Sequence, residues 1–362
     1  MCQYAARDGR AQIHHHVNYG RFAMGGAGLV MVEVTAVMPQ GMGTPGDLGL
    51  WNDEQQQALA QVALTITELD AVPAIQLGHA GRKGSCQRPW HGGAPLGGQD
   101  LVERGEQGWT VVAPSSLPIS SVHQNPIMLD FDGIEQIGNA FVEAASRAVE
   151  AGFRVIEIHA AHGYLLHQFL SAQTNKRNDL YGGGPTSRRV LLCSIVRRIK
   201  TTLPTDCALF VRVSAEDALD PASTIDDTVQ LAAALKEAGV DAIDCSSGGL
   251  MGRASASQLV HKLGYQVPFA AAIRRGASIP TVAVGLILDG PQAEAILQAG
   301  DAELIAIGRA ALDDPNWPLR AQSMLGAEEF DHWPSESGWW LARRARLLAE
   351  IREGQKQDEQ RQ

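Results

Sequence analysis

Cysteine is scarce in this chain of 362 residues, and no two cysteines are spaced as C-x-x-C. Zinc ribbons, cysteine-ligated iron–sulfur clusters and disulfide frameworks depend on clustered or paired cysteines, so the sequence argues against all three. We therefore expect no metal centre built on cysteine. The five cysteines are Cys2, Cys86, Cys193, Cys207 and Cys245.

Long apolar runs and excess positive charge are also lacking. No stretch approaches the roughly 18 apolar residues of a membrane span, and the first residues do not resemble a signal peptide. The formal net charge of -10 argues against a surface that binds nucleic acid or anionic lipid. Hydrophobic residues make up 45% of the chain, which excludes a disordered chain and indicates a globular core. We expect a cytoplasmic enzyme without membrane or nucleic-acid partners.

Short runs rich in valine and isoleucine alternate with longer helical patterns. Such near-continuous apolar runs suit strands that are buried on both faces of a parallel sheet. Their alternation with helices indicates an α/β architecture. The predicted strands cover residues 28–37, 72–79, 153–159, 208–214, 241–247, 280–287 and 302–308. The predicted helices cover residues 53–69, 134–151, 188–203, 224–238, 267–276, 291–299 and 317–325.

Seven predicted strands leave two architectures open. An open doubly wound sheet tolerates seven strands, whereas a (β/α)8 TIM barrel needs eight to close. A helical pattern at residues 14–24 precedes the first strand. A barrel would leave that pattern if its first strand lay upstream of Met1. We therefore favour a (β/α)8 barrel that lacks its first strand in this chain.

The chain is expected to form one domain over residues 1–340. Residues 80–132 are too long for an ordinary connection, and long loops in compact domains are usually lids or binding loops. We expect this insertion to cap a substrate. Residues 341–362 are polar and charged, which predicts a frayed helix or a disordered tail.

Polar residues and glycines gather where the predicted strands end, which is where a barrel of this class builds its active site. Gly285 and Gly308 end the last two strands, and Arg309 follows directly. Backbone N–H groups at such glycines bind phosphate in many proteins, and an arginine adds a bidentate contact. Alternatively, the glycines only permit tight turns. The other strand-end residues are Ala36, Gln76, His79, His159, His162, Arg212, Ser246 and Ser247.

The segment His159 to Tyr164 contains three candidate catalytic side chains within six residues. The two histidines could ligate a metal, although no third ligand is placed as in HExxH. They could instead donate hydrogen bonds to one developing oxyanion, or be satisfied within a turn. Tyr164 is protonated at neutral pH and could donate a proton, or simply pack. The sequence alone leaves these alternatives open.

Several motifs together resemble the old yellow enzyme family of FMN-dependent ene-reductases. They are IHAAHGYLLHQFLS at residues 158–171, NKRNDLYGG at 175–183, GAGLVMVEVTAV at 26–37, IQLGHAGRKG at 75–84 and AIGRAAL at 306–312. The resemblance covers nearly all of residues 1–320. MCQY at the start is similar to the bacterial subgroup of NADPH dehydrogenases and xenobiotic reductases, which carries a cysteine near the flavin.

The resemblance implies a (β/α)8 barrel that uses FMN and NADPH, or more broadly NAD(P)H, to reduce activated C=C bonds. Enones and nitro compounds would be the small-molecule substrates, and the protein would form a homo-oligomer. The implied FMN-binding residues are Ala36, Gln76, Arg212, Gly285, Gly308 and Arg309. The implied substrate and catalytic residues are Cys2, which tunes the flavin, Tyr4, which contacts substrate, His159 and His162, which bind the substrate oxygen, and Tyr164, which donates a proton.

Two other functions compete with this one. A chain that lacks its first strand could be an inactive, flavin-binding barrel. A dienoyl-CoA reductase-like enzyme shares the barrel but would need an iron–sulfur region with clustered cysteines, which this sequence does not contain. In the resembling subgroup the C-terminal segment often reaches a neighbouring subunit, which makes Trp340 or Arg343 a candidate for an intersubunit contact.

Overall fold

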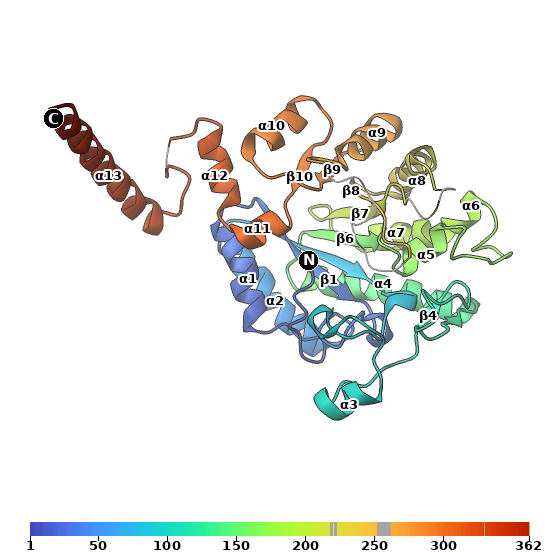
Figure 1. Ribbon diagram of the computed structural model, residues 1–362. Helices are drawn as coiled ribbons and strands as arrows, with labels where there is room; N and C mark the ends of the chain where they lie inside the picture. The colour runs from blue at the N-terminus through green and yellow to red at the C-terminus, as the bar shows by residue number, and fades with distance from the viewer. Residues whose placement is uncertain (218–219, 221–222, 252–261, 329, 362) are drawn as a thin grey trace.

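One parallel sheet of eight strands organises the computed structural model, which describes residues 1–217, 220, 223–251, 262–328 and 330–361. The strand order is β10-β9-β8-β7-β6-β3-β1-β2. Helices surround the curled sheet, as Figure 1 shows. The strands are β1 (Leu29–Ala36), β2 (Leu48–Gly49), β3 (Val72–Gly78), β6 (Val155–Ala160), β7 (Ala208–Ser214), β8 (Ala242–Ser246), β9 (Thr281–Val284) and β10 (Leu304–Ala306).

The seven predicted strands all form, and the eighth strand of the sheet is the two-residue β2. It pairs only with the end of β1, where Thr35 lies opposite Leu48 and Ala36 opposite Gly49. Among the described strands, β10 pairs with β9 alone. Backbone pairing therefore does not close the sheet between β10 and β1, and Leu304 of β10 is 44% exposed.

The predicted helices also form, with the expected end signals. The Asn52 side chain accepts a hydrogen bond from the Gln55 N–H at 3.0 Å and begins α2. Thr224 and Asp227 form a capping box at the start of α8. Gly152 follows α4 with φ of 101°, a conformation that favours glycine. The main helices are α1 (Ile13–Met24), α2 (Asp53–Thr67), α4 (Phe131–Glu150), α7 (Val190–Thr202), α8 (Ile225–Ala238), α9 (Val267–Ala277), α10 (Gly290–Gln298) and α12 (Trp317–Met324). The short helices beside them are α5 (Leu165–Leu170), α6 (Pro185–Arg188) and α11 (Arg309–Asp313).

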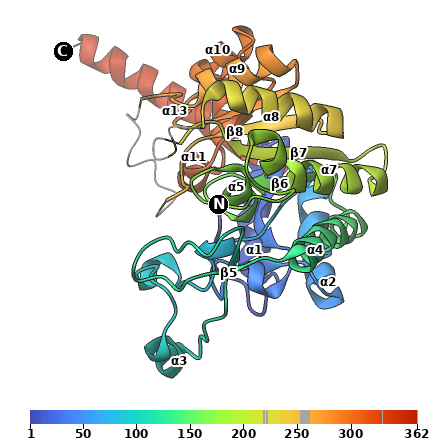
Figure 2. The ribbon, with the colours of Figure 1, turned by 90° about the vertical axis from the view of Figure 1, so that its right-hand side faces the viewer.

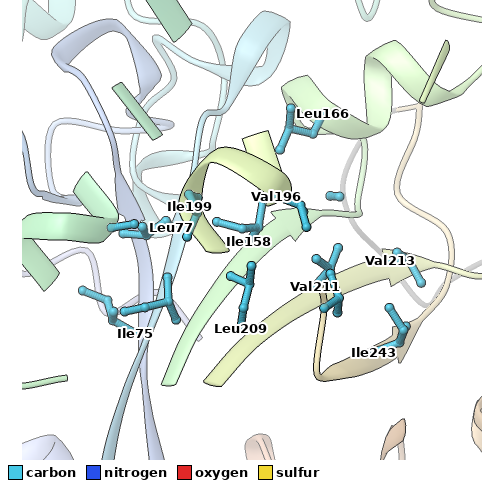
Figure 3. Packing of buried hydrophobic residues seen from close by; sticks show 14 of the residues in the cluster. Ile75, Leu77, Ile158, Leu166, Val196, Ile199, Leu209, Val211, Val213 and Ile243 are labelled. Carbon is cyan, nitrogen blue, oxygen red and sulfur yellow. The ribbon is translucent and has the colours of Figure 1, made fainter. Parts of the chain in front are cut away.

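Alternation along the strands separates two apolar cores. Outward-facing residues such as Ile75, Leu77 and Ile158 pack against the helices, as Figure 3 shows. Inward-facing residues form a smaller cluster that fills the barrel floor. The next inward positions toward the C-terminal strand ends are polar, so the barrel carries a polar layer above an apolar floor. The floor consists of Ala74, Val155, Phe210, Ala242 and Val282, with Leu29, Met31, Ala208 and Ala306 packed against them.

Two segments extend beyond the barrel. The insertion after β3 contains α3 (Gly98–Arg104), β4 (Val112–Ala113) and β5 (Ile127–Met128), and Figure 2 shows α3 far from the sheet. Helix α13 (Ser335–Arg361) projects away from the body in Figure 1. The expected boundary after residue 340 lies inside this helix. No helix in the described ranges combines the length and the apolar character needed to cross a membrane.

Candidate active site

Neighbouring strands bring the predicted flavin residues to one end of the barrel. Gln76 of β3 and Arg212 of β7 face inward above the floor. The Gln76 Nε2 atom donates to Glu157 Oε1 at 2.6 Å, which leaves the Gln76 amide oxygen for another donor. The Arg212 Nε atom lies 3.4 Å from Asp244 Oδ2 and donates no hydrogen bond to any described residue. The Arg212 guanidinium is thus partly exposed and can still donate hydrogen bonds to a ligand.

The ends of the last two strands meet the requirements of a phosphate site. Gly285 has φ of 112°, and an added Cβ would lie 2.8 Å from Gln266 Nε2, so glycine is required there. An added Cβ on Gly308 would lie 3.6 Å from Met1 Sδ and within 4 Å of no other described heavy atom outside its chain neighbours. Arg309 is exposed and begins α11. With the buried Ala36 of β1, Gln76 of β3 and Arg212 of β7, these residues fit FMN, because they supply amide, guanidinium and backbone donors from five separate strands.

His159 and His162 form a hydrogen-bonded pair with Ser246. His159 Nδ1 accepts from the Ala161 N–H at 3.2 Å, so its Nε2 carries the proton when the ring is neutral. That Nε2 lies 3.3 Å from His162 Nδ1, and His162 Nε2 lies 2.7 Å from Ser246 Oγ. Burial, together with the charge of Arg212, lowers the pKa of both imidazoles well below the usual 6.5. Both rings are therefore neutral hydrogen-bond donors at neutral pH.

Tyr164 packs against the same histidine pair. Its ring meets the His159 ring edge-on, with centroids 4.9 Å apart and planes at 86°. Burial raises the pKa of its phenol well above 10, so the hydroxyl stays protonated. A protonated phenol beside two neutral imidazoles can supply one proton and, when the ligand replaces His162 Nδ1 and Ser246 Oγ as acceptors, two hydrogen bonds to that ligand.

Lys83 is a site residue that the sequence motif contains but to which it assigns no role. Its Nζ atom donates to the His162 carbonyl oxygen at 2.8 Å and also to the Gly249 carbonyl oxygen. It lies 5.8 Å from the centroid of the Tyr164 ring. Burial lowers the pKa of Lys83 to about 7. The lysine therefore joins the loop after β6 to the loop after β8 at the point where His162 adopts φ of 57°.

The N-terminal residues lie beside this group. The Gln3 N–H donates to Glu33 Oε1 at 2.8 Å, and the Tyr4 carbonyl oxygen accepts from Arg88 Nε at 3.1 Å. Burial raises the pKa of the Cys2 thiol, with Asp47 and Glu33 adding to the effect. Burial raises the pKa of the Tyr164 phenol, and Cys2 and Tyr4 lie near enough to add to this effect when they are ionised. The structure thus brings both N-terminal candidates near the proton-donor candidate.

Glu157 and Asp244 are polar site residues that are absent from the predicted set, although they pair in register with the predicted residues Gln76 and Arg212. A carboxylate inside an otherwise apolar strand (VIEIHA and AIDCS) is the sequence signal that could have found them.

Comparison with known proteins identifies the family. Residues 1–328 match the family described as NADH:flavin oxidoreductase / NADH oxidase. The chain belongs to this family. It is 41% identical over 341 residues to an NADPH dehydrogenase of Geobacillus sp. (strain WCH70), covering 94% of this chain and 92% of the relative. An NADPH dehydrogenase of Bacillus subtilis (strain 168) is also 41% identical, with 94% and 93% covered.

The fold is shared with a solved structure. Morphinone reductase superposes with a TM-score of 0.73 at 24% identity, covering 90% of this chain and 84% of its own. The predicted barrel and family are confirmed. The protein is a flavin-dependent oxidoreductase that uses FMN and a reduced nicotinamide, as the sequence resemblance implies. The roles of individual site residues stay predictions.

Proposed function

We propose that this flavoenzyme passes hydride from NADPH through FMN to the activated C=C bond of an enone or a nitro compound. The neutral His159–His162 pair, with protonated Tyr164 against it, carries the proposal. Both lie at the end of β6, adjacent to β3 and β7, which carry Gln76 and Arg212. Five free thiols suit a reducing compartment, and we propose the cytoplasm as its location.

The imidazole pair would bind the oxygen that activates the alkene. FMN supplies the hydride to the β-carbon when it is bound. Negative charge then develops on the substrate oxygen, and neutral N–H donors already in place stabilise it without reorganisation. His162 Nε2 now faces Ser246 Oγ and His159 Nε2 faces His162 Nδ1, so the substrate oxygen would replace both of these acceptors.

Tyr164 would deliver the proton to the α-carbon. Its raised pKa keeps the proton on the phenol until a strongly basic carbon forms. Solvent then returns a proton to the phenolate. The product gains one hydride and one proton, which balances the reduction of one C=C bond.

Replacing Arg309 by alanine is expected to weaken FMN retention. The loss of one charge-assisted contact to phosphate corresponds to about 1.5–3 kcal/mol, or roughly 10- to 150-fold in the dissociation constant. Fluorescence titration of the FMN-free protein measures this change. Arg275→Ala is the control, because Arg275 lies on α9 and pairs with Asp301. Equal FMN affinity in both variants would contradict the phosphate assignment.

Turnover under nitrogen tests the proposed reaction. FMN-loaded protein with NADPH and a cyclic enone should consume NADPH only when the enone is present, and should yield the saturated ketone. A yellow protein without turnover would indicate a non-catalytic flavin-binding barrel instead.

We also propose a homo-oligomer in which α13 packs against a second copy. Trp340, Leu347 and Ile351 are exposed on this helix, and their spacing of seven and four residues places them on one face. The double variant Trp340→Ala, Leu347→Ala should lower the molar mass measured by light scattering. Ile13→Ala on α1 removes an equally exposed side chain and should leave it unchanged. An unaltered mass in the double variant would count against α13 as the contact.

A further inference from the structure

The polar layer of the barrel holds two carboxyl groups for one cation. Glu157 is 1% exposed and Asp244 is 6% exposed. Arg212 lies between their strands and pairs with Asp244. The apolar floor seals the layer from below, since Val155, Phe210 and Ala242 occupy the preceding inward positions of the same three strands. Two ionised carboxylates here would leave a net negative charge in an environment that strongly disfavours it.

One buried oxygen of the two carboxyl groups has no hydrogen-bond donor among the described residues. Glu157 Oε1 accepts from Gln76 Nε2, and Asp244 Oδ2 faces Arg212. Asp244 Oδ1 is buried and accepts from no described residue. The two carboxyl groups lie close enough for the negative charge of Asp244 to raise the pKa of Glu157, after the larger effect of burial. Two carboxylates cannot donate to each other, whereas one proton on Glu157 supplies the missing donor and removes the repulsion.

We propose that Glu157 and Asp244 share one proton and, with Arg212, form a neutral triad that positions the Arg212 guanidinium toward bound FMN. Glu157 and Asp244 are positioning residues here, because they act through Arg212. The flavin part of the proposal rests on the proposed function, which assigns Arg212 to the cofactor. With one carboxyl protonated, Asp244 alone balances Arg212, and no net negative charge lies beneath the flavin site.

The ionisation of the pair supports this arrangement. Burial, with the negative charge of Asp244 adding to it, raises the pKa of Glu157 to about 8. Burial also raises the pKa of Asp244, against the lowering effect of Arg212. The groups that face Glu157 are Gln76 of β3, Arg212 of β7 and Asp244 of β8.

A raised pKa makes the stability of the protein depend on pH with a defined sign. Between the ordinary value of 4.5 and about 8, the folded state holds a proton on Glu157 that the unfolded chain releases. The folded state is therefore favoured at the lower end of this window, and the contribution is lost as pH rises through 8. Glutamine at position 157 mimics the protonated side chain and removes this dependence.

Denaturant unfolding of FMN-free protein at pH 5.5 and pH 8.5 tests the shared proton without any flavin chemistry. We expect Glu157→Gln to be more stable than the unaltered protein at pH 8.5 and to lose that advantage at pH 5.5. Glu143→Gln, an exposed change on α4, should shift neither midpoint. A Glu157→Gln variant that is destabilised equally at both pH values would overturn the proposal, because Glu157 would then be an ionised partner of Arg212.

If Glu157→Gln does not fold, infrared spectroscopy of the unaltered protein detects the shared proton instead. We expect a carboxylic-acid C=O band at pH 7 that disappears as pH rises through 8. The band should be absent at pH 7 in Asp244→Asn, where Glu157 ionises to pair with Arg212. No band titrating near pH 8 in the unaltered protein would overturn the shared proton.

An FMN titration at pH 6.5 and pH 9 tests the flavin part. Affinity should fall at least threefold at the higher pH in the unaltered protein and stay within that margin in Glu157→Gln. If stability follows the expected pH dependence but FMN affinity does not, the link from the triad to the flavin is wrong. If neither protein binds FMN, the assignment of Arg212 to the cofactor fails, and the stability result alone decides the shared proton.

Discussion

Replacing His159 or His162 by alanine is expected to slow alkene reduction by about 10²- to 10³-fold. Each change removes one neutral donor to the developing oxyanion, a loss of about 2.7–4 kcal/mol of transition-state stabilisation. Because both rings are neutral at neutral pH, the loss is one of hydrogen bonding rather than of charge. Steady-state kinetics with a cyclic enone measures the effect, and the binding of a phenol to the oxidised enzyme should weaken in parallel.

Two further variants serve as controls for the histidine substitutions. His332→Ala removes an exposed histidine far along the chain from the site and should have no effect. Ser246→Ala frees His162 Nε2 from its protein acceptor and keeps the donor, so its effect should be much smaller than that of His162→Ala. If Ser246→Ala slowed the reaction as much as His162→Ala, the imidazole would act through the serine and not on the substrate.

Tyr164→Phe is expected to separate the two halves of the catalytic cycle. Reduction of the flavin by NADPH needs no proton from the protein, so it should keep its rate. Reduction of an enone should slow by the ~10²–10⁴ typical of general acid catalysis. Stopped-flow absorbance at the flavin band records each half separately. If both halves slowed equally, or neither slowed, Tyr164 would be a packing residue.

Much of the fold follows from local sequence patterns. Ile75 and Leu77 belong to the outer core, whereas Gln76 between them faces the barrel interior. Their alternation in the sequence therefore predicts which face of the strand is which. The near-continuous apolar runs identify seven strands, because strands buried on both faces leave such runs. Strand β2 escapes detection because two residues carry no periodicity. It pairs with the end of β1, and its Leu48 side chain is fully buried in the main core.

The site is predictable where its residues follow one strand and is hidden where contacts span the chain. His159, His162 and Tyr164 are close in sequence, so their convergence at the end of β6 follows from the strand alone. The contact of His162 with Ser246 joins residues 84 positions apart. The contacts of Lys83 depend on loops after two different strands. No local pattern encodes such pairs, since only the closing of the sheet brings them together.

Isotope placement in the product shows which carbon receives the hydride and which receives the proton. The reaction is run on a cyclic enone under nitrogen with FMN-loaded enzyme, once with NADPH deuterated at C4 and once with ordinary NADPH in heavy water. We expect nicotinamide deuterium at the β-carbon and solvent deuterium at the α-carbon of a saturated ketone, with α-labelling strongly slowed in Tyr164→Phe. Reduction of the carbonyl to an alcohol, or nicotinamide deuterium at the α-carbon, would contradict the proposed reaction.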